Sequence, residues 1–161
     1  MVTRQTVPTV QVLSNSAWWK RLLADVRGAT EVLVGSYLFD NSALVAGLLK
    51  RLEGRVPFAL TVLVDKAGLT DETCRFQRPR LAALRAAGAE VRLCTGKPPY
   101  GIFHVKALVV DRKLAFTGNG NLTNKMTQNV ELLMVLGGPP VADVLRLLER
   151  ERESGRLWDG S

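Results

Sequence analysis

A histidine and a lysine two residues apart are the side chains in this sequence best suited to act on a phosphate. His104 is the only histidine among the 161 residues, and Lys106 precedes an apolar run that ends at Asp111. If residues 103–111 form a strand, His104 and Lys106 project from one face, because side chains alternate along a strand. A lone histidine is more often an ordinary hydrogen-bonded side chain than a catalytic group. The lysine held beside it favours the catalytic interpretation.

A second polar group follows in the segment TGNGN, where Gly118 precedes Asn119 and Asn121. Glycine lets backbone approach a ligand closely, and the two amides can donate hydrogen bonds to it. A neutral nucleophile or base, a fixed cation and amide donors can together stabilise the charge that develops on phosphoryl oxygens. The set suits a metal ion poorly, and Cys74 and Cys94 complete no zinc site with a single histidine.

The spacing of five of these residues resembles the HxK(x)4D(x)6GxxN signature of the phospholipase D superfamily. The five are His104, Lys106, Asp111, Gly118 and Asn121. The resemblance continues with Asn129 and Glu131, an Asn-x-Glu sequence expected on the next strand, and extends upstream to about residue 10. Asn119 departs from the family pattern, which usually has serine after the glycine. An amide can still donate a hydrogen bond to a phosphate oxygen.

The resemblance implies a metal-independent phosphodiesterase that uses no cofactor. In that chemistry one histidine attacks phosphorus to form a phosphohistidine, and a second histidine protonates the leaving group. This chain has one histidine and cannot supply both groups. The resemblance therefore implies a homodimer in which each protomer contributes His104 to one site on the two-fold axis, as in the small one-motif members of the family. Otherwise the protein does not catalyse this reaction.

Within each half of such a site, the resemblance assigns His104 as nucleophile or general acid. Lys106 and Asn121 would hold phosphoryl oxygens, with Asn119 as a helper. Glu131 would orient the imidazole as the carboxylate of a catalytic triad does. Two further motif residues are expected to have supporting roles: Asp111, which lies on the face opposite Lys106 in a regular strand, and Gly118.

The net charge favours a polyanionic partner. Lysine and arginine number 22 against 15 aspartates and glutamates, which gives a charge of +7. Basic residues are dense just upstream of the histidine, and Arg75, Arg78 and Lys97 are candidates to bind substrate phosphates. The alternative is that this basic run is simply a solvated surface. The polar stretch between Asp65 and Arg78 is long for a connection and is also a candidate for substrate contact.

Three functions remain open from the sequence. The favoured one is hydrolysis of nucleic-acid phosphodiesters, DNA or RNA. A phospholipase D-type lipid phosphodiesterase or phosphatidyl transferase is the alternative, which predicts an apolar rim that the sequence does not reveal. The third is a non-catalytic nucleic-acid-binding module. No signal peptide and no membrane-spanning stretch is recognisable, so a soluble chain is expected and its compartment is left open.

The elements that must position these residues follow an α/β pattern. Helices are predicted at 15–28, 43–54, 78–88 and 139–156, and strands at 30–39, 58–65, 89–94, 103–111, 114–118 and 129–138. Trp18 and Trp19 have helical spacing, which is more typical of core residues than of a base-stacking surface. We expect one domain over residues 1–161, with a mixed, largely buried sheet flanked by helices in a phospholipase D-like fold.

Overall fold

Apolar, β-branched runs form a sheet of eight strands at the centre of the molecule. The computed structural model describes residues 7–70 and 75–160. The strands are β1 (Thr9–Leu13), β2 (Glu31–Ser36), β3 (Ala59–Asp65), β4 (Glu90–Cys94), β5 (Lys106–Val110), β6 (Leu114–Gly118), β7 (Leu133–Gly137) and β8 (Arg156–Leu157). Their order across the sheet is β1-β7-β6-β5-β2-β3-β4-β8. The pairs β2–β3 and β3–β4 are parallel, and the other neighbouring pairs are antiparallel.

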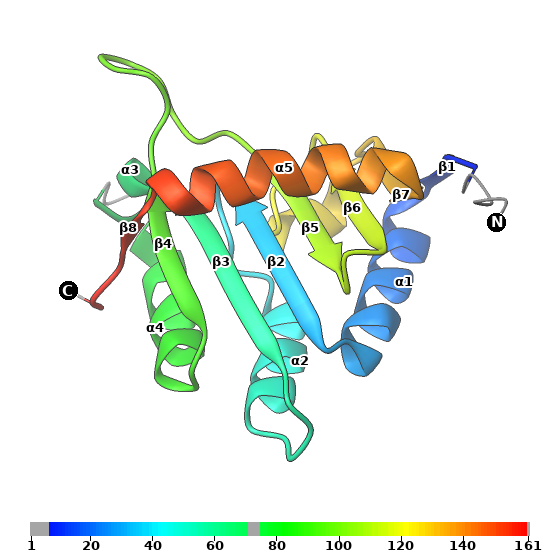
Figure 1. Cartoon of the computed structure of the whole chain (residues 1–161), viewed down its shortest axis with the longest axis horizontal. Coiled ribbons are helices and arrows are strands. Elements are labelled where there is room, and N and C mark those ends of the chain that lie inside the picture. The colour runs from blue at the N-terminus through cyan, green and yellow to red at the C-terminus, as the bar shows by residue number, and fades with distance from the viewer. Residues whose placement is uncertain (1–6, 71–74, 161) are drawn as a thin grey trace, which may run out of the picture.

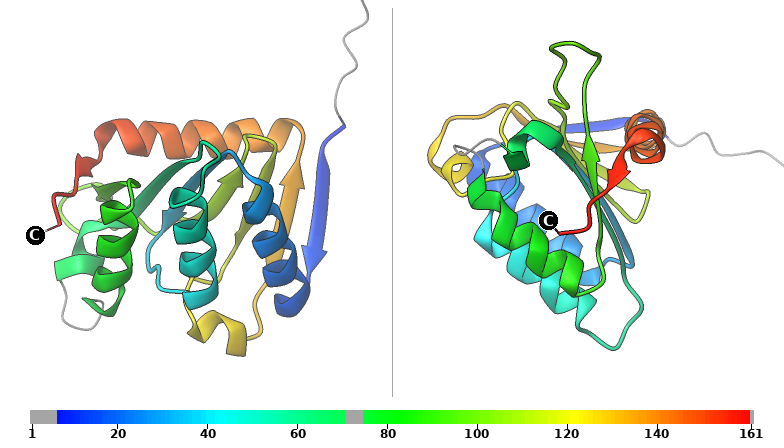
Figure 2. Two further views of the ribbon diagram at one scale, coloured as in Figure 1. Left: turned by 90° about the horizontal axis from the view of Figure 1, so that it is seen from below. Right: turned by 90° about the vertical axis from the view of Figure 1, so that its left-hand side faces the viewer.

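Helices cover both faces of this sheet. The helices α1 (Asn15–Gly28), α2 (Ser42–Leu52) and α4 (Arg78–Ala86) lie on one face, and α5 (Pro139–Ser154) crosses the other (Figures 1 and 2). Alternation along β2 explains the two cores: Val32 and Val34 pack with α1, α2 and α4, whereas Leu33 packs with α5. The predicted mixed, buried sheet flanked by helices is thus confirmed.

Two strands were not expected from the sequence. Strand β1 pairs antiparallel with β7 at one edge of the sheet, and β8 pairs with β4 at the other. Val10 and Val12 in β1 are largely exposed. The two valines alternate with the polar Thr9 and Gln11, but the run is short and its apolar side chains face solvent, so it differs from the buried strands that sequence prediction finds most readily.

Polar contacts hold the start of helix α1, which spans the residues predicted for it. Ser14 caps α1, because its hydroxyl accepts from the Ala17 amide. The Asn15 side chain instead donates to the carbonyls of Met126 and Asn129, at 2.9 and 2.6 Å. Helix α1 is thereby tied to the short 3₁₀ helix η2 (Lys125–Gln128), which precedes β7.

The connection after β3 is partly helical, contrary to the loop expected there. Helix α3 (Lys66–Thr70) follows β3 directly, and Asp65 accepts from the amides of Ala67 and Gly68. The 3₁₀ helix η1 (Arg75–Gln77) then leads into α4. Residues 71–74, including Cys74, lie outside the described part of the chain.

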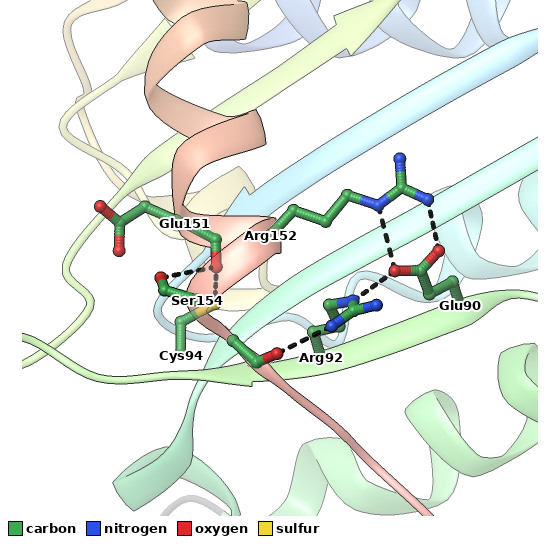
Figure 3. Close-up of polar contacts among 7 residues, drawn as sticks. Glu90, Arg92, Cys94, Glu151, Arg152 and Ser154 are labelled. Carbon is green, nitrogen blue, oxygen red and sulfur yellow. Dashed lines mark hydrogen bonds and ion pairs between the residues drawn. The ribbon is translucent and has the colours of Figure 1, made fainter.

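A charged network joins the end of α5 to β4 (Figure 3). Arg152 donates to both carboxylate oxygens of Glu90, at 3.0 and 2.5 Å, and Arg92 donates to the same carboxylate. Arg92 also reaches the Gly155 carbonyl at 2.8 Å. The hydrogen bonds from Arg152, together with those from Arg92, outweigh the effect of burial and lower the pKa of Glu90 to about 2.

Within residues 7–70 and 75–160, no helix combines the length and the apolar character that crossing a bilayer would require.

Candidate active site

Four neighbouring strands, β2, β5, β6 and β7, have ends that meet on one side of the sheet, where the motif residues Lys106 and Gly118 lie. Strand β5 is antiparallel to both β2 and β6, so its first residue, Lys106, lies where those two strands end. Ser36 at the end of β2 is the register partner of Lys106, and Gly118 at the end of β6 is the partner of Leu133 at the start of β7. Figure 1 shows this edge, from which the connection between β4 and β5 projects.

The Tyr37 ring is the common neighbour of His104 and Lys106. Its centroid lies 5.0 Å from that of the His104 imidazole in an edge-on arrangement, and 5.9 Å from the Lys106 ammonium. The Tyr37 amide donates to the Val105 carbonyl at 2.9 Å, and the Lys106 ammonium donates to the His104 carbonyl at 3.1 Å. The structure thus brings imidazole and ammonium to one side of the chain, around an aromatic ring.

His104 itself lies outside the strand, which corrects the predicted strand from residue 103. Strand β5 starts at Lys106, and the side chain of His104 is exposed. Among the described residues, no hydrogen bond to the imidazole is present. Strand alternation therefore does not align His104 with Lys106. Instead, both side chains lie against the ring of Tyr37.

Glu131 lies near Lys106. The sequence interpretation expected Glu131 to orient the imidazole of His104, but within the described chain the two side chains share no hydrogen bond. One of its carboxylate oxygens accepts from the Asn129 side chain at 3.0 Å. Burial lowers the pKa of Lys106, and the negative charge of Glu131 opposes that shift. Both Asn129 and Glu131 precede β7, which begins at residue 133, so neither is on the strand where the sequence placed it.

The turn after β6 is built on close contact with the segment before β7. A Cβ at Gly118 would lie 2.4 Å from the Leu132 carbonyl oxygen, so a side chain is excluded there. Asn119 exchanges two bonds with Leu132: its amide donates to the carbonyl at 3.3 Å, and its Oδ1 accepts from the Leu132 amide at 2.7 Å. The side-chain NH₂ of Asn119 is therefore left as the donor, on an exposed residue.

Asn121 contributes a buried polar atom. Its Oδ1 is buried and has no hydrogen-bond partner among the described residues. A buried amide oxygen without a partner is uncommon in folded proteins and suggests a missing donor. Beside it, a Cβ at Gly120 would lie 3.0 Å from the Glu131 carboxyl carbon, so the glycine lets this carboxylate approach the turn.

Asp111 lies at the other end of β5, away from the histidine. One carboxylate oxygen accepts from the Thr30 amide, the Thr30 hydroxyl and the Glu31 amide, at 2.7, 2.9 and 2.9 Å. Burial raises the pKa of Asp111, but these hydrogen bonds outweigh it and hold the pKa below its ordinary value. Asp111 thus fastens the β5–β6 hairpin to the start of β2.

A cleft of about 600 Å³ opens beside the motif. Three motif-region residues, Asn119, Asn121 and Glu131, line it. Its other lining residues are Leu38, Asp40, Phe76, Gly120, Thr123, Asn124, Lys125, Met126 and Asn129. Sequence reasoning missed Phe76 and Lys125 in particular. The only local signal was the polar segment NKMTQN directly after the motif.

Two of the predicted phosphate-binding residues, Arg78 and Lys97, do not line this cleft. Arg78 is the exposed first residue of α4, and Lys97 is exposed in the projecting connection. Arg75 begins η1, and its side chain lies outside the described part of the structure. Trp18 and Trp19, only 1% and 7% exposed, are core residues.

The described residues contain no group of three or more histidines, cysteines, aspartates or glutamates placed to hold a metal ion.

Residues 23–151 match the family model described as "Cardiolipin synthase, PLD-like domain". Because the match spans most of the chain, the protein belongs to the phospholipase D-like family. Members of this superfamily are phosphodiesterases. Among curated proteins, no sequence matches the chain significantly.

Solved structures share the fold at low sequence identity. The phospholipase D family member Nuc from Salmonella typhimurium has a TM-score of 0.77 and 20% identity, over 94% of this chain and 99% of that one. NucT from Helicobacter pylori has a TM-score of 0.78 and 14% identity, over 94% and 100%. Phosphatidylserine synthase from Haemophilus influenzae Rd KW20 has a TM-score of 0.60 and 15% identity, over 98% of this chain and 41% of that one. The predicted fold and superfamily are confirmed.

Proposed function

We propose that this protein is a metal-independent phosphodiesterase that cleaves nucleic acid through a phosphohistidine. The observation that supports this most is the placement of His104 and Lys106 around Tyr37, at the same sheet edge as Asn119 and Asn121. Together they offer a nucleophile, a cation and amide donors, the groups that a phosphoryl transfer requires.

The reaction proceeds in two steps, formation of the phosphohistidine and its hydrolysis. An imidazole nitrogen attacks phosphorus, the bond from phosphorus to the leaving oxygen breaks, and a second, protonated imidazole gives its proton to that oxygen. Water then attacks the phosphohistidine; the second imidazole accepts a proton from this water, and the phosphorus–nitrogen bond breaks. In both steps Lys106 and Asn121 bind the non-bridging oxygens. The unpartnered Oδ1 of Asn121 accepts a hydrogen bond, for example from the substrate or from a second protomer.

The second imidazole comes from a second copy of the chain. Each protomer has one histidine, so a two-fold axis beside His104 is the simplest way to bring two imidazoles together. Exposed apolar side chains support this arrangement, because Ile102 is 46% exposed, Leu132 is 58% exposed and Val130 is fully exposed. These three residues lie within two positions of His104 or Glu131. A protomer that covers them would remove them from water.

The charge of the chain supports nucleic acid as substrate. A net charge of +7 attracts a polyanion, and Lys125 places a further cation at the cleft. TrmBL2, an archaeal chromatin protein with a novel mode of DNA binding, shares the fold with a TM-score of 0.61 and 15% identity, over 97% of this chain and 56% of that one. Arg78 and Lys97 do not line the cleft, but both are exposed and add to the positive charge of the surface.

A lipid phosphodiester is the second candidate, on one specific observation. The connection that carries His104 also exposes Tyr100 and Ile102, at 91% and 46%, which is the apolar rim that sequence reasoning did not find. The matched family model is named for cardiolipin synthase, and phosphatidylserine synthase shares the fold. The dimer and the lipid explanation both use the exposed side chain of Ile102.

The test is cleavage of end-labelled single-stranded DNA and RNA, with and without EDTA, beside His104→Ala. We expect cleavage that EDTA leaves intact and that His104→Ala abolishes. Vesicles containing anionic phospholipid form the parallel arm. Turnover of lipid alone would replace the first candidate by the second, and binding of polynucleotide without any turnover would indicate a binding module. Cleavage that EDTA abolishes would contradict the proposed mechanism.

A heterodimer tests the shared site directly. Two differently tagged chains, one wild type and one His104→Ala, are co-expressed and purified through both tags. A shared site that needs both histidines leaves this heterodimer nearly inactive, whereas two independent sites leave it half as active as the wild type. A heterodimer of two wild-type chains, purified through the same tags, is the control.

A further inference from the structure

We propose that the cleft beside the motif binds one unpaired nucleobase of the substrate, next to the phosphate that is cleaved. This inference rests on the proposed function and adds to it a base-binding subsite and a preference for single strands. Asn119, Asn121 and Glu131 belong to both the motif region and the wall of the cleft. A nucleotide whose phosphate lies at the motif therefore has its base within reach of the cleft.

The volume of the cleft is large enough for a base that has left the helical stack. Its volume of about 600 Å³ is in the range of small-molecule sites. The edges and faces of a base in a duplex are occupied by pairing and stacking, so only an unpaired or extruded base can enter a side pocket. The subsite therefore discriminates between single and double strands without reading the backbone.

Phe76 supplies a stacking surface at this cleft. Its side chain is 46% exposed although it is a large aromatic residue. The neighbouring Gln77 is fully buried and holds η1 in place, since it accepts from the Phe39 amide at 2.9 Å and donates to the Gly68 carbonyl at 2.8 Å. An exposed ring on a fixed segment is the arrangement with which proteins stack bases of any sequence.

Another part of the wall is a set of polar residues that hydrogen-bond to one another. The Asp40 carboxylate accepts from the Asn124 amide, and the Asn124 side chain both donates to the Asp40 carbonyl and accepts from the Ser42 amide. Asn15 ties η2 to α1 in the same way. Because these polar groups hydrogen-bond to one another, this part of the wall has its shape before substrate binds.

The groups left available are those that a base edge and its phosphate need. The Oδ1 of Asn121 is buried without a partner, and Asn119 retains its side-chain NH₂ because its Oδ1 is bonded to the Leu132 amide. The exposed NH₂ of Asn119 can donate to an acceptor on the edge of a base. Lys125 is an exposed cation on the same wall and can reach the adjacent phosphate.

The experiment measures binding and does not depend on turnover. All proteins carry His104→Ala, so that substrate survives, and fluorescence anisotropy follows a labelled ten-nucleotide single strand. The comparison strands are an abasic strand of equal length and charge and a blunt duplex of the same sequence. We expect the normal strand to bind at least 10-fold more tightly than either. Phe76→Ala should weaken its binding by roughly 5- to 150-fold, the range measured for loss of base stacking.

Two matched variants keep the result interpretable. Phe76→Tyr retains the ring and should restore tight binding of the normal strand. Leu147→Ala removes a partly exposed apolar side chain from α5, on the other face of the sheet, and should leave binding unchanged. Circular dichroism establishes that each variant is folded.

Equal affinity for normal and abasic strands would overturn the base-binding subsite, and so would an unaffected Phe76→Ala. Loss of vesicle binding in Phe76→Ala, with strand binding intact, would assign the cleft to a lipid instead. Failure of the phosphodiesterase proposal is recognised separately, because it appears as absent cleavage by the wild-type chain in the preceding assay.

Discussion

The two ends of strand β5 carry residues of one motif but have opposite physical character. At the start of the strand, His104 is exposed and lacks hydrogen bonds to its imidazole within the described chain. At the far end, one oxygen of Asp111 accepts three hydrogen bonds from Thr30 and Glu31. The first end leaves polar groups available for a ligand, whereas the second uses them within the protein. A single sequence motif therefore combines groups for chemistry with a group for folding.

The hairpin turn explains why an aspartate suits the second end. Asp111 and Arg112 have φ values of +49° and +56°, and the Lys113 amide donates to the Val110 carbonyl at 3.0 Å. Val110 pairs with Leu114, so three residues connect the strands. Two consecutive positive φ values are typical of a primed turn, and aspartate tolerates them better than most residues. Asp111 thus satisfies the turn and the start of β2 together.

The largest effect is expected at the first end, from Lys106→Met. The variant removes the cation proposed to stabilise phosphoryl oxygens, so kcat/KM on a labelled single strand should fall by roughly 10²- to 10³-fold. The melting temperature should stay the same or rise. Burial lowers the pKa of Lys106, which indicates that the charged form is unfavourable in this partly buried position.

Lys113→Met provides the control from the other end of the strand. Lys113 is exposed beside the turn and should be dispensable for turnover. If Lys106→Met kept full activity, or if both variants lost activity equally, the assignment of chemistry to one end of β5 would be wrong.

An intermediate effect is expected at the second end, from Asp111→Ala. The variant leaves the Thr30 and Glu31 amides without their acceptor and places alanine at positive φ. The free energy of unfolding should fall by about 2 kcal/mol, measured by urea denaturation. Asp111→Asn retains an acceptor and tolerates the turn, so it should lose only about half as much. Catalysis by the folded fraction should stay near that of the wild type; a selective loss of kcat would contradict a supporting role.

The same carboxylate predicts a pH dependence with a definite sign. Its pKa is lower in the folded protein than in the unfolded chain, so protons bind more readily to the unfolded state. The stabilisation is complete above the unfolded pKa of about 3.9 and is lost as pH falls through the folded pKa. The stability difference between wild type and Asp111→Asn should accordingly shrink below about pH 4.

Sequence reasoning succeeded where the information is local. The motif from His104 to Asn121 spans a single hairpin and its flanking residues. The buried strands and helices are recognisable from their apolar runs. It failed where exposed or distant contacts decide the structure. Strand β1 has only a short alternation, and its Val10 and Val12 face solvent at the sheet edge. His104 lies before β5 and contacts the Tyr37 ring, which comes from a segment distant in the sequence.

The cleft was out of reach for the same reason. Phe76 and Asp40 reach the motif from segments that precede it by at least 28 residues, and the pairing of strands that brings them there is set by the whole sheet. The hydrogen bond of Glu131 could not be predicted either. Its donor is the side chain of Asn129, two residues away, and the resemblance alone could not distinguish that donor from the imidazole of His104.

The smallest effect is expected outside strand β5, at the network in Figure 3. Glu90→Gln weakens the bonds from Arg152 and Arg92 that hold α5 to β4, and should cost about 1 kcal/mol because the carboxylate is only partly buried. That corresponds to a fall of roughly 2–4 °C in the melting temperature. The pKa of Glu90 is about 2 in the folded protein, against an ordinary 4.5, so the difference from wild type should be full above about pH 5 and vanish as pH falls toward 2. Asp143→Asn, which breaks a highly exposed pair with Arg146 on the same helix, should change nothing measurable. Equal losses in the two variants would mean that burial and multiple donors add no strength to the Glu90 network.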